Sequence, residues 1–394
     1  MGVMGLKKLR TAVCLMLLGL MVPAIFLVRG GLPMDVQPLI EKKYGGWAGT
    51  LRLWVYEGWS PGAGSAALWL NGCVSSFEKA HPGVYVQPEY VDAGALRDLG
   101  RDGILPPDMA LFPPGVLESG EAFLPLDAPE SLRGPLREVG GRRAAPVMLG
   151  GYLWVYNGDK LPGIPTSWVD AELTPSVHAD EPRRLWSAAL LALCSQIPEE
   201  EAPELPSDEL DLGLPAFAPL PRGFVFNDDA YRDFTSGETS VMLATQREIR
   251  RLEALDDQGK GVNWHIAGWG GGMFTDQVLY LGLVDRGDAD REPLCRAFAE
   301  HLLSDACQSQ LHKIGAFAVT GAPSGYVDRE PLAIMDSALR VGDLAAAPAF
   351  GSGWRDAVEE IVREFLNNDG DPTLLWPRLK AVLTENPNIP RKDF

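Results

Sequence analysis

The chain is poor in the residues that support redox, metal or nucleophilic chemistry. Its 394 residues include only five cysteines and five histidines. His301 and His312 lack the i, i+4 spacing of a two-histidine metal-binding helix face. No GxSxG, HExxH or GxxxxGK[ST] motif is present. The sequence therefore predicts no catalytic residue, no metal site and no cofactor, and it argues against an enzyme.

The cysteines are scattered along the chain. They occupy positions 14, 73, 194, 295 and 307, without a CxxC pair. Cys295 and Cys307 are close enough in sequence to pair, but both fall in one predicted helical segment. Unpaired, buried thiols are therefore expected, since free cysteine behaves as a small apolar residue.

Positive charge is also in deficit. Lys and Arg number 35 against 53 Asp and Glu, which gives a net charge of −18. Phosphates repel such a surface, so nucleic acid and anionic membrane surfaces are excluded as partners, and a neutral or cationic ligand fits better. Hydrophobic residues make up 46% of the chain. That share supports substantial cores, and the length predicts about two to three domains.

Only one long hydrophobic run is present, an uncharged stretch over residues 11–28. Lys7, Lys8 and Arg10 precede it and Arg29 closes it, which is typical of an export signal. No clear cleavage site follows, and Cys14 lies too early in the run for lipid attachment. We expect residues 1–30 to be an uncleaved membrane anchor rather than a cleaved signal, followed by a linker over 31–49. Either way, the rest of the chain is expected outside the cytoplasm, at the cell surface.

The first part of the folded region has a β-α-β pattern. Residues 50–56 and 84–91 are rich in strand formers, and residues 68–80 between them have helical periodicity. A short apolar strand is predicted over 109–112. Consecutive strands joined by a helix predict a parallel sheet.

The apolar run over residues 145–156 is predicted to be one strand that enters a turn at Asn157. By alternation Tyr152, Trp154 and Tyr156 share one face, which is core or ligand cleft, with core favoured. Later helices are predicted over 229–234, 241–255, 354–366 and 373–383. The strongest predicted helix covers 291–315 and ends at Gly315. Residues 198–221 are expected to form an acidic loop, and 268–272 a glycine-rich one.

Several motifs follow one another across roughly residues 50 to 385. They are LRLWVYEGW, FEKAHPGVYVQPEYV, PPDMALF, FLPLD, PVMLGGYLWVYNGDKLPG with PTSW, FTSGETSVM and AFAEHLLSDACQSQLHKIGAFAVTG. In this order they resemble the extracellular solute-binding proteins of carbohydrate-type ABC importers. Two departures bear on the ligand rather than the fold. Residues 239–241 stand where the family has an alanine pair, and Ala318 stands where proline is common.

The resemblance implies an α/β, two-lobed periplasmic-binding-protein-like fold. Each lobe would hold a mixed, mainly parallel sheet flanked by helices. Lobe 1 would comprise residues 50–155 plus 266–320, and lobe 2 residues 156–265 plus 321–394. Residues 146–156 would cross between the lobes, which makes Gly150 and Gly151 hinge candidates.

Six residues are candidates for ligand contact. Glu57 and Trp59 follow the first strand, at the carboxyl end where α/β sheets place ligands. The alternative is an exposed loop with Trp59 packed on its neighbours. Asp108 precedes the short strand and is equally well explained as a turn cap. The other three are Thr245 and Arg247, beyond the FTSGETSVM motif, and Trp269 in the glycine-rich loop, where bare backbone permits close approach. For Thr245 and Arg247 the alternative is a solvated helix face.

The resemblance therefore predicts an extracytoplasmic binding protein. It would capture a small polar solute, a sugar or oligosaccharide, by lobe closure, and deliver it as a monomer to ABC permease subunits. The alternative is a membrane-anchored sensor or accessory protein that retains the fold without transport.

Overall fold

The computed structural model describes residues 47–99, 105–161, 176–178, 225–227, 230–266, 273–326, 330–341 and 344–351, together with residues 360 and 364. The predicted anchor, the acidic loop, the glycine-rich loop with Trp269, and nearly all of the two C-terminal helices lie outside these residues. No helix within the described ranges is both long and apolar enough to cross a membrane.

The first sheet has the strand order β2-β1-β3-β11-β4. Its strands are β1 (Gly49–Val55), β2 (Val84–Tyr90), β3 (Met109–Phe112), β4 (Ala144–Leu149) and β11 (Val278–Leu283). β1 runs parallel to β2 and β3, whereas β11 runs antiparallel to β3 and β4. The predicted β-α-β opening is confirmed, with helix α2 (Ala66–Ala80) between β1 and β2.

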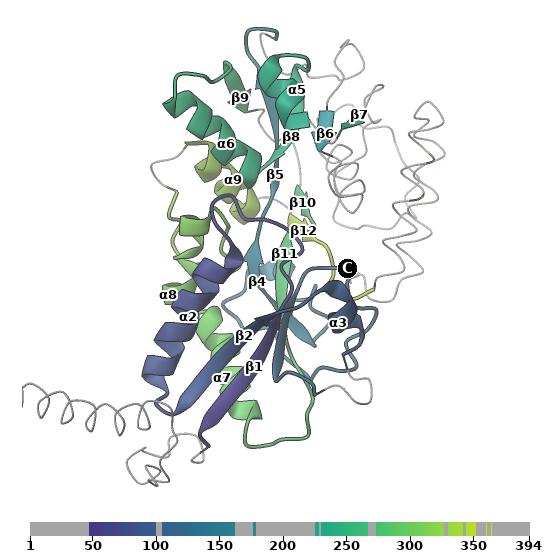
Figure 1. Ribbon diagram of the computed structural model, residues 1–394, viewed down its shortest axis with the longest axis vertical. Coiled ribbons are helices and arrows are strands. Elements are labelled where there is room, and N and C mark those ends of the chain that lie inside the picture. The colour runs from purple at the N-terminus through teal and green to yellow at the C-terminus, as the bar shows by residue number, and fades with distance from the viewer. Residues whose placement is uncertain are drawn as a thin grey trace, which may run out of the picture. The chain divides into compact units, whose positions relative to one another are not determined.

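Helices α2 and α7 (Glu292–Leu302) pack beside each other against this sheet (Figure 1). Phe77 of α2 is fully buried, and its ring meets that of Phe298 of α7 edge-on at 5.1 Å. α2 ends at Ala80 with His81 as its C-cap, and Gly83 adopts a left-handed φ of 91° in the turn to β2. A left-handed turn residue stops the helix and lets the chain reverse into the next strand.

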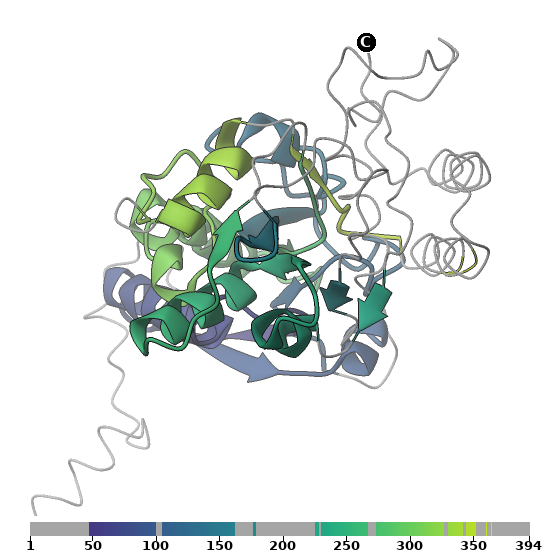
Figure 2. The ribbon, with the colours of Figure 1, turned by 90° about the horizontal axis from the view of Figure 1, so that it is seen from above.

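The second sheet has the order β7-β6-β8-β5-β9. Its strands are β5 (Tyr152–Asn157), β6 (Ser176–His178), β7 (Val225–Asn227), β8 (Val241–Thr245) and β9 (Trp264–Ile266). Both sheets are mixed, since β6 pairs in parallel with β7 and β8 while β5 pairs antiparallel with β8 and β9. Helices α5 (Ala230–Ser236) and α6 (Gln246–Asp257) lie next to β8 (teal in Figure 2).

Smaller elements complete the described chain. They are α3 (Ala93–Arg97), η2 (Gly134–Leu136), α8 (Asp305–Gln308), η6 (Leu311–Ile314), α9 (Glu330–Val341) and a parallel pair, β10 (Met273–Thr275) with β12 (Leu344–Ala346).

Three predicted elements are wrong in detail. The single strand over 145–156 is two strands, because Gly150 and Gly151 end β4 and β5 starts in the other sheet. The predicted helix over 241–255 starts as a strand, since residues 241–245 are fully buried and pair on both sides. The long helix over 291–315 is three helices, because Ser304 caps a new one with its side chain. The left-handed Gly315 does end the last of them, as predicted.

Candidate functional site

The chain passes between the two sheets at Gly150-Gly151. β4 of the first sheet ends at Leu149, and β5 of the second begins at Tyr152. The sequence-based boundary after residue 155 fell inside β5. The chain returns from β9 to β11 through residues 273–277, which lie alongside this crossing. Gly150 N donates to the Gln277 carbonyl at 2.7 Å, and Thr275 Oγ1 donates to the Gly150 carbonyl at 2.9 Å.

Two buried glutamines bind both crossings together. Gln246, the first residue of α6, is 0% exposed, and Gln277 is 1% exposed. Gln246 Nε2 donates to Gln277 Oε1 at 2.7 Å, and Gln246 Oε1 accepts the Gly151 N–H at 3.0 Å. A buried amide left without partners costs about 1–3 kcal/mol. The pair therefore holds α6, the forward crossing and the return crossing in one arrangement.

The two glycines of the crossing have different surroundings. A Cβ on Gly150 would lie 2.4 Å from Gln277 Oε1 and 2.7 Å from Gln246 Nε2, so any larger residue would displace the two buried amides. A Cβ on Gly151 would find its nearest atom, Leu339 Cδ1 of α9, at 3.4 Å, which is an ordinary contact. The sterically demanding position is thus Gly150.

Glu57 lies in the loop after β1, at the carboxyl edge of the first sheet. Its carboxylate accepts the backbone N–H groups of Ala67 and Ala66 at the start of α2. Partial burial raises the pKa of the Glu57 carboxyl, and the two N–H bonds only partly offset this effect. Tyr90, at the end of β2, is 52% exposed, and burial together with the Glu57 charge raises the pKa of its hydroxyl. A carboxylate and an exposed aromatic side chain therefore lie near each other at this edge.

Trp59 is buried, and its Nε1 donates to the Val278 carbonyl of β11 at 3.2 Å. These contacts match the packing interpretation of this residue. The same loop reaches the start of α6, because Gln246 Nε2 also donates to the Ser60 carbonyl at 3.4 Å. Trp59 therefore supports the loop that meets the crossing.

Thr245 and Arg247 lie at the start of α6. Thr245 is the N-cap residue, and it forms a capping box with Glu248, whose carboxylate accepts the Thr245 N–H at 3.0 Å. Thr245 also faces Tyr152 across β8 and β5, which places it beside the crossing. Arg247 is exposed, and its guanidinium has no hydrogen bond or ion pair to any described part of the chain.

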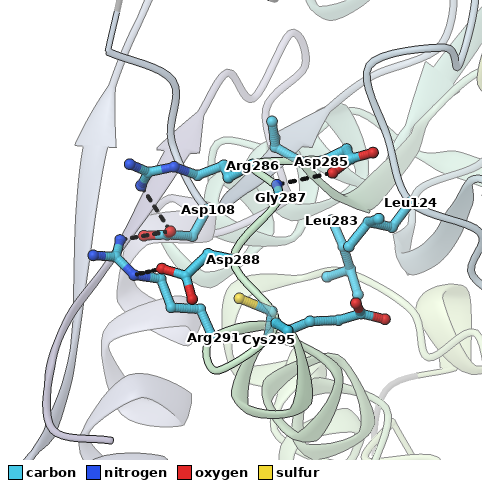
Figure 3. Close-up of a pocket in the computed structure, with 12 residues that line it drawn as sticks. Asp108, Leu124, Leu283, Asp285, Arg286, Gly287, Asp288, Arg291 and Cys295 are labelled. Carbon is cyan, nitrogen blue, oxygen red and sulfur yellow. Dashed lines mark hydrogen bonds and ion pairs between the residues drawn. The ribbon is translucent and has the colours of Figure 1, made fainter.

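Asp108 lies at the opposite, amino edge of the first sheet (Figure 3). It is 3% exposed, and Asp108 Oδ2 accepts the Arg52 N–H at 2.7 Å. Asp108 Oδ1 accepts from Arg286 at 2.8 Å and Arg291 at 3.0 Å. These groups line a cavity of about 240 Å³ that also reaches Cys295, whose pKa burial raises to about 12. Asp108 is therefore not grouped with Glu57 and Trp59, since its charge is balanced inside the lobe.

The structure thus brings four of the predicted residues together at the crossing: Trp59, Thr245, Gly150 and Gly151. Glu57 lies at the carboxyl edge of the first sheet, Arg247 is exposed at the second position of α6, and Trp269 lies outside the described residues. Sequence reasoning missed Gln246, Gln277 and Tyr90. Gln277 had a detectable signal, because it is the last polar residue before the apolar run VLYLGL.

Three solved structures with a similar fold are named for a carbohydrate ligand or were solved with one. The cyclic alpha-maltosyl-1,6-maltose binding protein from Arthrobacter globiformis matches with a TM-score of 0.58 at 13% identity, over 86% of this chain and 100% of its own. An ABC substrate-binding protein from Listeria monocytogenes in complex with cycloalternan matches with 0.56 at 12%, over 86% and 99%. The GacH receptor of Streptomyces glaucescens, solved unliganded and with acarbose, matches with 0.51 at 17%, over 85% and 96%.

No protein-family model matches the chain, and no curated protein matches it in sequence. At these identities the solved structures establish the architecture, and they do so over nearly their whole length. The two mixed sheets, the paired crossings and the structural matches agree: this chain has the two-lobed α/β fold of periplasmic binding proteins.

Proposed function

We propose that this protein is an extracytoplasmic solute-binding protein that captures a sugar or oligosaccharide and delivers it to an ABC permease. The observation that carries the proposal is the match of almost the whole chain to three carbohydrate-binding structures. The predicted export segment supports the location, with residues 1–30 as a membrane anchor. The protein acts by binding and catalyses no reaction.

In this proposal Gly150 and Gly151 are the hinge of lobe closure. Closure changes backbone dihedrals at a few residues while the packed sheets move as bodies. The buried Gln246–Gln277 pair lies at the pivot, where a short hydrogen-bonded network can stay intact as the sheets rotate. A ligand that contacts both lobes stabilises the closed form by its differential affinity for it.

The proposed ligand contacts are Glu57, Tyr90 and Arg247. A sugar hydroxyl donates to a carboxylate oxygen of Glu57, and the apolar face of the sugar lies on the exposed ring of Tyr90. Arg247 donates from the second lobe. Sites of this kind combine an aromatic surface with a few polar groups that fix orientation. Trp59 and Thr245 act behind them as support, and Trp269 stays a candidate contact.

A thermal-shift screen of the full chain tests this function. The panel contains linear maltooligosaccharides, cyclic tetrasaccharides and acarbose, with an amino acid, a tripeptide and a polyamine as controls. A binder at 100 times its Kd stabilises the folded state by about 2.7 kcal/mol, which gives a clear rise in Tm. A rise with the peptide or polyamine and with no carbohydrate would rule out the sugar assignment.

Transport is tested separately from binding. Deletion of the gene is expected to abolish uptake of the identified sugar, and the E57Q variant is expected to restore it only in part. Normal uptake in the deletion strain, with sugar binding retained in vitro, would instead support the sensor alternative.

A further inference from the structure

Helices α2 and α8 each carry a buried cysteine at the place where they meet. Cys73 of α2 and Cys307 of α8 are both 3% exposed. Side chains of neighbouring helices form hydrogen bonds with the backbone carbonyl of each cysteine. Trp69 Nε1 of α2 donates to the Cys307 carbonyl at 2.9 Å, and His301 Nε2 of α7 lies 3.1 Å from the Cys73 carbonyl. Two residues far apart in sequence are thereby held in a defined relation.

The two thiols lie close enough to affect each other's ionisation, and each is the largest influence on the pKa of the other. This interaction, together with burial, raises the pKa of Cys73. It lowers the pKa of Cys307, and the neighbouring Ser304 and Ser76 side chains lower it further. Cys307 is therefore the thiol that ionises first, and thiolate is the form that reacts. Ser76 is exposed, so this cluster is close to the surface.

We propose that Cys73 and Cys307 are joined by a disulfide in the exported protein, covalently tying α2 to α8. The contact between α2 and α8, the hydrogen bonds that fix the backbone at both cysteines, and the burial of both side chains carry the inference. All three described cysteines are buried free thiols in the structure. No described cysteine influences the pKa of Cys295, on the neighbouring α7, so we expect Cys295 to stay reduced. A disulfide needs an oxidising compartment, and that condition rests on the extracytoplasmic location proposed above. The placement of the two cysteines does not depend on that proposal.

The reaction is a thiol–disulfide exchange with an oxidised dithiol, such as a disulfide-donating oxidoreductase or oxidised glutathione. The Cys307 thiolate attacks one sulfur of the donor, its S–S bond breaks, and one donor thiol leaves. Cys73 then loses its proton, and its thiolate attacks the Cys307 sulfur of the mixed disulfide. The second donor thiol leaves. The protein loses two hydrogen atoms and the donor gains them.

A non-reducing peptide map tests the linkage. The full chain is exported to an oxidising compartment, blocked with N-ethylmaleimide during denaturation, and digested with trypsin. Arg296 separates Cys295 from Cys307, and Lys79 and Arg296 separate Cys73 from both, so each cysteine falls in its own peptide. We expect the Cys73 and Cys307 peptides to be linked until dithiothreitol is added, and the Cys295 peptide to carry the blocking group.

Thermal unfolding gives a second readout. Reduction is expected to lower the Tm of the oxidised protein by about 5 °C, because the bond closes a very long loop. The C295S variant should keep this shift, and the C73S/C307S variant should lose it. Blocked Cys73 and Cys307 in the exported protein, and again after incubation with oxidised glutathione, would overturn the proposal, as would linkage of either to another cysteine. The map needs no ligand, so it is independent of the sugar screen.

Discussion

Two carboxylates at opposite edges of the first sheet show that acidic side chains can have very different roles in one domain. At the amino edge, Asp108 is fully engaged by the Arg52 backbone and two arginine side chains. At the carboxyl edge, Glu57 accepts two backbone N–H groups, and no described cation pairs with it. Both were candidates for ligand contact from sequence. A carboxylate whose charge is already balanced stabilises the lobe, whereas one that lacks a counter-charge has capacity left for a ligand.

The Asp108→Asn substitution tests whether Asp108 stabilises the fold rather than binds ligand, and it has the largest expected effect. Removing one partner of a buried ion pair leaves the arginines uncompensated, and with both of them partly exposed we expect a loss of about 3 kcal/mol in the free energy of unfolding. Urea denaturation measures it, with the exposed Glu300→Gln substitution as the matched control. Sugar affinity should be unchanged. A large loss of affinity with normal stability would return Asp108 to the ligand site.

At the crossing between the sheets, the buried polar groups are the neutral amides of Gln246 and Gln277. Gly150→Ala would drive a Cβ into Gln246 and Gln277, and overpacking of this kind costs about 1–3 kcal/mol. Gly151→Ala, one residue on, is the matched control and should be close to neutral. Urea denaturation and sugar titration of both variants check this. Equal effects of the two substitutions would contradict the assignment of Gly150 to the amide pair.

The Glu57→Gln substitution tests whether the Glu57 carboxylate binds the ligand. Loss of a charge-assisted hydrogen bond to the ligand should weaken sugar binding about 10-fold or more, while the unfolding free energy changes little. Isothermal titration with the sugar from the thermal-shift screen measures the affinity. An unchanged Kd would show that Glu57 serves only the start of α2.

The smallest expected effect is a pH dependence. The pKa of Glu57 is raised above its ordinary value of 4.5, so the folded protein binds this proton more tightly than the unfolded chain. Its stabilising contribution is present below 4.5 and is lost as the pH rises through the raised pKa. The stability of the wild type relative to E57Q should therefore fall across that window and then level off. Denaturation at a series of pH values measures the difference. A difference that rises over the same window would contradict the raised pKa.

Much of the fold was predictable from local pattern. The strands at 49–55, 84–90 and 109–112 and helix α2 come from alternating or helical apolar residues that end at turn formers. Such signals lie within one segment. The strand at 241–245 was misassigned as helix, because a short apolar run before a helix has no periodicity of its own. Only its pairing with β5 and β6 distinguishes it.

The site was harder to predict than the fold. Glu57 was predicted as a ligand contact from its position after a strand, and Gly150 and Gly151 as hinge candidates from the family motif. Gln246 and Gln277 are separated by about thirty residues, and nothing in either segment shows that their amides meet. Asp108 was a separate candidate with a turn cap as its alternative, and its position before a strand did not show that two distant arginines pair with it.

The sequence by itself determined the α/β class, the order of the elements, the absence of familiar enzyme motifs and the resemblance to sugar-binding proteins. These follow from composition, periodicity and motif order, which are properties of neighbouring residues. The tertiary structure decided which polar groups are already satisfied: Asp108 by its arginines and Thr245 by its capping box. Whether a group is free for a ligand depends on partners brought from distant segments, and only folding brings them together.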